Sequence, residues 1–329
     1  MAAYVWGMIK CLLAVLTIFL LNPGFADAQA MDNTGLFRDV PSNKYFRINY
    51  ENDFFTASDR DYTQGILIEK VHPALNRFPL MKVLWHPANS EIKYGLAIEH
   101  NAYTPNEIVE YGIQYGDRPY AGVLLLKTFL IASNDEREQR FSVSLSTGIL
   151  GPAAGGEQMQ RTIHHWIHYA QPQGWHNQIR NDLALNYQVN GEKEIYRYST
   201  HFSVSAYGSA RTGTLSDKLS AGVTGMLGNF ISPFAHPALL KRPFQWYVYD
   251  QLLGNAVGYD ATLEGGLFNR SSVYTIPGAD INRLTLQNKF GLVLIFHSFY
   301  IEYYHTGLTE EFKTSLYHKT GGIQIGFGF

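Results

Sequence analysis

The chain has 329 residues, of which only 16% are charged, and its 22 Tyr and 20 Phe help to bring the aromatic share to 14%. The formal net charge of −2 is too close to neutral to favour a polyanion, so we expect no nucleic-acid partner. Cys11 is the single cysteine, which excludes an intramolecular disulfide.

The N-terminus has the pattern of a secretory signal. Lys10 precedes an apolar run over residues 11–21, which ends in helix-breaking Asn, Pro and Gly, and Ala26–Ala28 offers the small residues that signal peptidase reads. The run is too short to span a membrane comfortably. We predict a signal peptide over residues 1–28 and one mature domain over 29–329. Because the mature domain has no cysteine, thiol catalysis and cysteine zinc sites are excluded.

Segments in which apolar and polar residues alternate recur through the mature chain. Alternation with a period of two is typical of strands that have one buried and one exposed face. No apolar stretch after the signal approaches the ~20 residues of a membrane helix. The strands that we predict are 44–53, 62–71, 94–101, 120–132, 139–149, 185–190, 195–208, 217–228, 244–261, 284–295, 299–306 and 318–329. This pattern predicts an all-β fold, a transmembrane antiparallel β-barrel of about 12 strands in the bacterial outer membrane.

The last strand shows the barrel pattern most clearly. From Ile323 to Phe329, apolar residues alternate with Gly or Gln. A terminal Phe resembles the signal that the barrel-assembly machinery recognises, so we expect this machinery as a partner during insertion. Short polar connections at 133–138, 190–193 and 297–298 predict tight hairpins, which belong on the periplasmic side. The other end then faces the outer leaflet and its lipids.

The longest outer connection carries a predicted helix over residues 157–170. Gln160 and His164 are four residues apart and share one helix face, and His168 continues that face. The His164/His168 spacing is compatible with metal binding, although no Glu lies between them. An ordinary cluster of interfacial histidines is an equally good interpretation of the spacing.

Polar residues also crowd the first predicted hairpin, NYENDFFTASDRDYTQG. Asn52 and Asp53 end its first strand, and Thr63 begins its second strand. These residue types favour turns, so a solvated turn is one interpretation. Half of an active site at the outer rim of the barrel is the other.

Three motifs, ENDFF…DRDYTQG, YGDRPYAGVL and GILGPAAGGEQMQRTIHHWIH…GW, together resemble the outer-membrane lipid A 3′-O-deacylase (LpxR) family. Members of that family are twelve-stranded barrels that remove the 3′-acyloxyacyl chain from lipid A in a calcium-dependent reaction. The resemblance implies a site between the barrel wall and a loop helix. Its residues fall on Asn52, Asp53, Thr63, Gln160 and His164, and lipid A within lipopolysaccharide is the implied substrate.

The implied chemistry is ester hydrolysis by activated water. His164 is expected to act as the general base, and a Ca²⁺ ion held by Asn52 and Asp53 is expected to polarise the ester carbonyl. Gln160 is expected to orient the water or to donate to the oxyanion, and Thr63 to hold Asp53 or the substrate.

One position departs from the family pattern. A family member has Glu six residues after the catalytic His, where this chain has Ala170. The activity could be weakened or altered, or Asp182 could supply the missing acid. Arg118 could bind a phosphate of lipid A, and an ion pair with Asp117 or another acid is the alternative.

Three other functions stay open from the sequence. A Ser-His phospholipase would use Ser58 or Ser146, neither of which lies in a recognisable nucleophile motif. A passive pore would need no histidine-bearing helix. A relative that has lost its catalytic activity is the third, because of Ala170.

Overall fold

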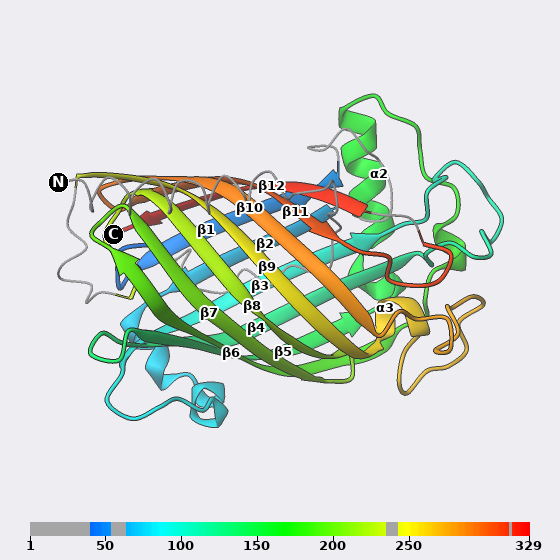
Figure 1. The fold of residues 1–329 in the computed structure, drawn as a ribbon. Coiled ribbons are helices and arrows are strands. Elements are labelled where there is room, and N and C mark those ends of the chain that lie inside the picture. The colour runs from blue at the N-terminus through cyan, green and yellow to red at the C-terminus, as the bar shows by residue number, and fades with distance from the viewer. Residues whose placement is uncertain (1–39, 54–63, 235–242, 316–317) are drawn as a thin grey trace.

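The computed structural model describes residues 40–53, 64–234, 243–315 and 318–329. Within these residues, antiparallel strands close into a single barrel, in which each strand pairs with its neighbours in the sequence and the first pairs with the last (Figure 1). The strands are β1 (Tyr45–Asn52), β2 (Gln64–Val71), β3 (Glu91–Tyr103), β4 (Ala121–Asn134), β5 (Gln139–Leu150), β6 (Asp182–Tyr198), β7 (Phe202–Gly213), β8 (Ser216–Asn229), β9 (Phe244–Asp260), β10 (Leu284–Phe296), β11 (Phe299–Leu308) and β12 (His318–Gly328). The predicted antiparallel barrel of about 12 strands is confirmed.

The predicted hairpin at 190–193 is wrong. β6 continues through this segment to Tyr198, and the chain turns at residues 199–201 instead, where Ser199 adopts a φ of 53°. Asn190 is buried in the middle of the strand, and its side-chain oxygen accepts hydrogen bonds from the hydroxyls of Tyr207 and Ser209. These bonds inside the barrel outweigh the local preference of Asn-Gly for a turn. The predicted strands 185–190 and 195–208 are therefore replaced by β6 and β7.

The two ends of the barrel differ in their connections. At the turn end, which includes the C-terminus, β4–β5, β6–β7 and β10–β11 are joined by short turns, whereas the longer connection 72–90 between β2 and β3 carries two 3₁₀ helices. At the loop end, residues 104–120, 151–181 and 261–283 form long loops that carry the helices α2 (Gly156–Trp166) and α3 (Ala261–Glu264) (Figure 1). The 3₁₀ helices are η2 (Pro73–Arg77), η3 (Pro79–Val83), η4 (Pro152–Ala154) and η5 (Trp175–Asn177). Among the described residues, no helix is long and apolar enough to cross a bilayer.

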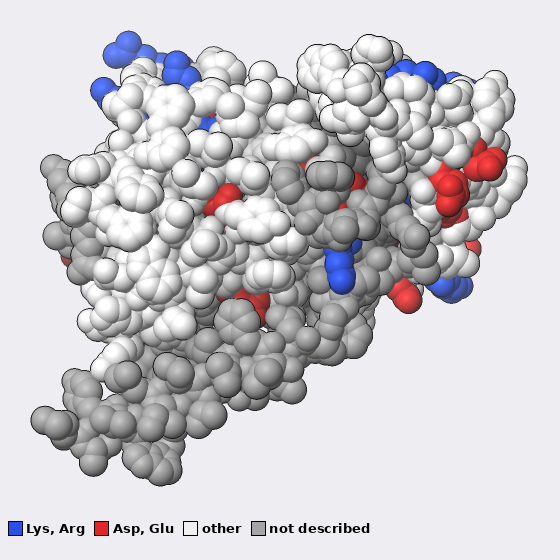
Figure 2. Space-filling model, turned by 90° about the horizontal axis from the view of Figure 1, so that it is seen from above, with Lys and Arg blue, Asp and Glu red and all other residues white. Residues whose placement is uncertain are grey.

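An apolar row crosses the outer face of five consecutive strands. Ile325, Ile48, Ile68, Ile98 and Leu126 are successive cross-strand partners, and all five side chains are exposed. In Figure 2, most of the described surface seen from above is uncharged, with a few acidic and basic side chains among the white residues. An outward apolar band of this kind is typical of a barrel wall that faces lipid.

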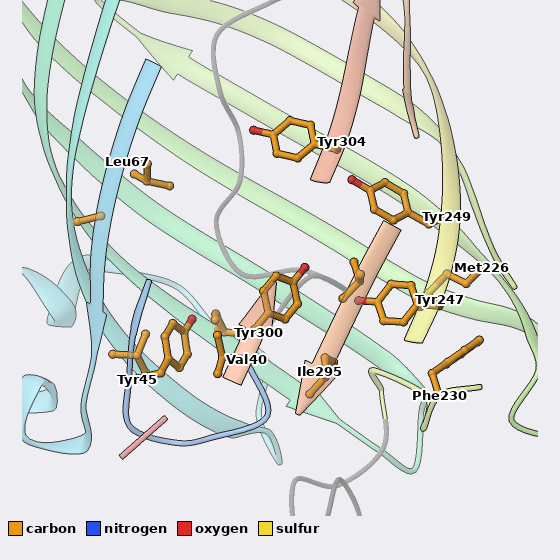
Figure 3. Packing of buried hydrophobic residues seen from close by; sticks show 14 of the residues in the cluster. Val40, Tyr45, Leu67, Met226, Phe230, Tyr247, Tyr249, Ile295, Tyr300 and Tyr304 are labelled. Atoms are coloured by element: carbon orange, nitrogen blue, oxygen red, sulfur yellow. The ribbon is translucent and has the colours of Figure 1, made fainter. Parts of the chain in front are cut away.

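The lumen is filled by side chains. Near the turn end, Tyr45, Tyr247 and Tyr300 project into it and pack with apolar neighbours (Figure 3). Arg47 and Glu69 form an ion pair of 2.9 Å that is almost completely buried. Closer to the loop end, the described residues line a narrow, partly open lumen cavity of about 30 Å³, room for about one water molecule. This packing disfavours a passive pore.

Candidate functional site

The loop helix α2 packs against the outer face of β4. On β4, the side chain of Val123 lines the lumen cavity. Its neighbour Gly122 therefore faces outward, because successive residues of a strand point to opposite faces. A β carbon added to Gly122 would lie 3.3 Å from the backbone nitrogen of Gly156, and one added to Gly156 would lie 2.7 Å from Trp175. Two glycines therefore allow the first turn of α2 to approach the wall closely. Gly155, with a φ of 78°, turns the chain into the helix.

One face of α2 buries Gln160 and His164, whose exposed fractions are 0% and 6%. The indole Nε1 of Trp175 donates a hydrogen bond of 2.6 Å to Oε1 of Gln160. Because an indole nitrogen can only donate, the amide oxygen of Gln160 must face Trp175. Its amide nitrogen must therefore point away from the indole. Trp175 is itself buried against Tyr120 and Ala102.

The backbone fixes the tautomer of His164. Its Nδ1 lies 2.6 Å from the carbonyl oxygen of Ala170, and since a carbonyl can only accept, Nδ1 carries the hydrogen. In the neutral ring, Nε2 then holds the lone pair, and no hydrogen bond from Nε2 to another described residue is found. The ring of Tyr169 packs edge-on against the imidazole at 5.1 Å. His164 is thus oriented as a base whose reactive atom is Nε2.

The predicted helix over 157–170 ends early, at Trp166. His168 lies beyond the helix with a φ of 56° and is exposed, so the prediction that it shares a face with His164 is wrong. His165 points to solvent as well. In the described part of the chain, no group of three His, Cys, Asp or Glu side chains could hold a metal ion.

Asn52 and Asp53 lie at the loop end of β1. Strand alternation directs Glu51 into the lumen, where it accepts a hydrogen bond from Thr320, and directs Tyr50 and Asn52 to the outer face. Asn52 donates a hydrogen bond of 3.1 Å to the Tyr50 hydroxyl, and the buried Asp53 carboxylate interacts electrostatically with the same tyrosine.

The structure thus gathers the predicted site residues into two pairs. Gln160 and His164 share the buried face of α2, which contacts β3 and β4. Asn52 is the last residue of β1 and Asp53 follows it, and β2 separates β1 from β3. The fifth predicted residue, Thr63, lies outside the described residues.

Two polar residues of this wall were not predicted as site residues, Gln64 on β2 and His100 on β3. Gln64 is 1% exposed, and neither atom of its amide makes a hydrogen bond with the described residues. His100 Nε2 lies 3.0 Å from the carbonyl oxygen of Ala154, while its buried Nδ1 has no hydrogen-bond partner in the described part of the chain. Strand parity could have identified both, because each occupies an outward position of a predicted strand, where a lipid-facing wall favours apolar residues.

Arg118 is buried in an ion pair. Its guanidinium pairs with Glu311, donates a hydrogen bond of 2.8 Å to Thr262 and stacks on the ring of Tyr103 at 4.3 Å. Burial alone would lower the pKa of Arg118, but the carboxylates of Glu311 and Asp260 outweigh it and raise the pKa, so the group stays charged. Arg118 is only 2% exposed, so burial rather than an open surface surrounds its guanidinium. The ion pair with another acid, the alternative to phosphate binding, is thus present.

Asp182 and Ser146 lie away from His164. The Asp182 carboxylate accepts hydrogen bonds from two backbone N–H groups of the β9–β10 loop, so it does not orient the imidazole. Ser146 lines the lumen cavity, on the opposite side of the wall from α2. The other candidate nucleophile, Ser58, lies outside the described residues.

Comparisons with known proteins agree with this architecture. A family model described as outer membrane protein LpxR matches residues 12–329. Among solved structures, the chain is similar to LpxR from Salmonella typhimurium, with a TM-score of 0.70 and 21% identity over 87% of this chain and 100% of that chain. The β domain of the Bordetella autotransporter BrkA matches with a TM-score of only 0.45 and 8% identity, over 87% of this chain and 99% of that chain. No curated protein sequence matches. Because the family model covers nearly the whole length, the chain belongs to the LpxR family of outer-membrane proteins.

Proposed function

We propose that this protein is an outer-membrane hydrolase that removes the 3′-acyloxyacyl chain from lipid A by attack of an activated water on the ester. The observation that carries the proposal is the oriented imidazole of His164, buried between α2 and the barrel wall with its basic Nε2 unoccupied by other described residues. In this proposal the loop end faces the outer leaflet, because the short turns belong to the periplasmic side.

His164 moves the proton in this mechanism. Nε2 takes a proton from the attacking water, and the hydroxide oxygen adds to the ester carbonyl carbon. The imidazolium keeps its Nδ1–H bond to the Ala170 carbonyl, so the ring does not rotate. Nε2 then returns the proton to the departing alkoxide as the carbon–oxygen bond breaks. The products are a free carboxylic acid and a sugar hydroxyl.

Gln160 acts as a positioning donor. Because Trp175 holds its amide oxygen, its amide nitrogen can donate to the water or to the developing oxyanion without a flip of the side chain. A preoriented donor of this kind stabilises charge that appears only in the transition state.

Asn52 and Asp53 fit a calcium ion by donor chemistry. An amide oxygen and a buried carboxylate are ligands that Ca²⁺ prefers, and adjacent residues present them at the outer rim. When bound, the ion would polarise the ester carbonyl as a Lewis acid. Thr63 would hold Asp53 or the substrate.

Mass spectrometry of lipid A after incubation with purified protein tests the proposal. We expect loss of the acyloxyacyl mass with wild-type protein in calcium, and intact lipid A with EDTA or with His164→Ala. His165→Ala is the matched control, because this neighbouring histidine is exposed on the same helix and should leave the activity unchanged. Lipid A that stays intact with the calcium-loaded wild type would rule the proposal out.

A further inference from the structure

Two polar side chains on the lipid-facing wall lack the partners that their burial demands. Gln64 is 1% exposed and His100 is 5% exposed. Oε1 and Nε2 of Gln64 and Nδ1 of His100 make no hydrogen bond with the described residues. An unsatisfied buried donor or acceptor is destabilising, so each such group calls for a partner, such as a ligand or an ordered water molecule.

These two side chains are close neighbours on one face. Gln64 pairs with Ala102 across β2 and β3, and His100 precedes Ala102 by two residues on the same face. Diagonal neighbours of this kind have Cα atoms ~7–8 Å apart, within reach of long side chains. Ala102 packs against Trp175, whose indole holds Gln160. The unsatisfied pair therefore lies beside the buried face of α2 that carries His164.

The donor and acceptor atoms that Gln64 and His100 offer to a ligand can be assigned. The Ala154 carbonyl accepts from Nε2 of His100, so the neutral ring offers Nδ1 as an acceptor. Gln64 offers two N–H donors and one acceptor. A ligand that satisfies both residues must present a donor and an acceptor a few ångströms apart. A secondary amide does so, whereas an ester has acceptors only and would leave His100 unsatisfied.

We propose that Gln64 and His100 bind the amide of an N-linked acyl chain of the lipid substrate, next to the ester that His164 hydrolyses. The amide N–H donates to Nδ1 of His100, and its carbonyl accepts from Nε2 of Gln64. Lipid A carries amide-linked chains beside its ester-linked ones, so this inference rests on the proposed function and adds a specificity determinant to it.

Gln64→Leu tests the proposal with two measurements. Because the substitution removes unsatisfied polar atoms, we expect an unchanged or higher Tm of the lipid-free protein. Binding of lipid A to a His164→Ala background, where no turnover occurs, should weaken about 10-fold, the loss typical of one or two neutral hydrogen bonds. A fall in Tm with unchanged lipid A binding would show that Gln64 is structural, and would overturn the proposal.

Gln251→Leu is the matched control. This buried glutamine faces the lumen, and its amide nitrogen donates a hydrogen bond of 2.9 Å to Thr224. We expect the opposite result, a lower Tm and unchanged lipid A binding, because a satisfied bond is lost far from the site.

Nanodiscs of two compositions test the amide assignment. Gln64→Leu and His100→Phe should weaken binding to lipid A but not to phosphatidylethanolamine, whose two chains are ester-linked. Equal losses for both lipids would refute recognition of an amide. Wild-type protein that binds lipid A through Gln64 without hydrolysing it would overturn the proposed function alone. Hydrolysis by the wild type together with full lipid A binding by Gln64→Leu would overturn this inference alone.

Discussion

Nδ1 of His164 donates a hydrogen bond of 2.6 Å to the main-chain carbonyl of Ala170. The resemblance to the deacylase family implies a carboxylate at this sixth position after the histidine, and Ala170 has none. The backbone of the same residue nevertheless faces the imidazole. The chain reverses direction just after α2, where His168 has a φ of 56°, and this brings the carbonyl into place. The orientation of the ring therefore does not require an acidic side chain.

Ala170→Glu should consequently change little. The Ala170 carbonyl already orients Nδ1, so an added carboxylate would not be needed to orient the ring. We expect kcat/KM for lipid A to change less than about 3-fold, whereas loss of an orienting group typically changes activity ~10–100-fold. Ala170→Gly, which keeps the carbonyl, is the control. A gain of 100-fold on adding the acid would show that the site lacks it.

Trp175→Phe should lower kcat. The substitution keeps an aromatic ring in the packing with Tyr120 but removes the donor that fixes the amide of Gln160. One hydrogen bond contributes about 1 kcal/mol, so we expect a decrease of roughly 5–10-fold in kcat with KM nearly unchanged. Trp166→Phe, at an exposed position of α2, should have no effect. A change confined to KM would contradict the positioning role.

Gly156→Val should displace α2 from the wall. Its β carbon would lie 2.7 Å from the Trp175 ring, a distance at which one of the two must move. We expect a loss of about 1–3 kcal/mol in the free energy of unfolding, and cleavage of the loop 151–181 by protease. Gly112→Ala is the control, since no atom lies within 4 Å of the added carbon. A protease-resistant, fully active Gly156→Val would contradict the close contact.

Glu311→Gln should destabilise the loop end. Arg118 would remain charged and buried without its ion-pair partner, with Asp260 as the remaining acid nearby. We therefore expect a loss of about 3 kcal/mol in the free energy of unfolding, the lower end for a broken buried pair, which urea unfolding in detergent would measure. The exposed ion pair between Lys313 and Asp280 provides the control, and Lys313→Ala should change the stability little. Equal stability of both variants would argue that Glu311 is not the main partner of Arg118.

The protein should not conduct ions. Tyrosines and the buried pair Arg47–Glu69 fill the described lumen, so a planar bilayer containing purified protein should show no steady conductance steps. Steady ohmic steps from the wild type would revive the pore interpretation.

Strand alternation predicted most of the barrel, because lipid and lumen impose opposite polarity on successive residues. It failed at Asn190, where buried hydrogen bonds across strands outweigh a local turn signal. Such pairings join residues far apart in the sequence, and the sequence alone does not show them.

Part of the candidate site was also predictable from the sequence. The spacing of Gln160 and His164 correctly indicated one shared face, whereas His168 was misassigned because a helix end depends on backbone geometry. The partner of His164 could not be predicted from residue types, because it is the backbone carbonyl of Ala170 and every residue has a backbone carbonyl. The site roles themselves stay predictions.

The apolar row on the outer wall also has a consequence for chemistry. Asn52 lies four residues beyond Ile48 on β1. At ~3.4 Å per residue and a strand tilt of ~40°, this places Asn52 roughly 10 Å from Ile48 along the barrel axis. In the proposed function, the apolar wall fixes how deeply a lipid chain can lie beside the rim at Asn52. Under the same proposal, an ester near the headgroup boundary would lie at the level of this rim, whereas bonds deeper in the hydrocarbon would not. The depth of a bond in the membrane would then help to select the bond that is hydrolysed.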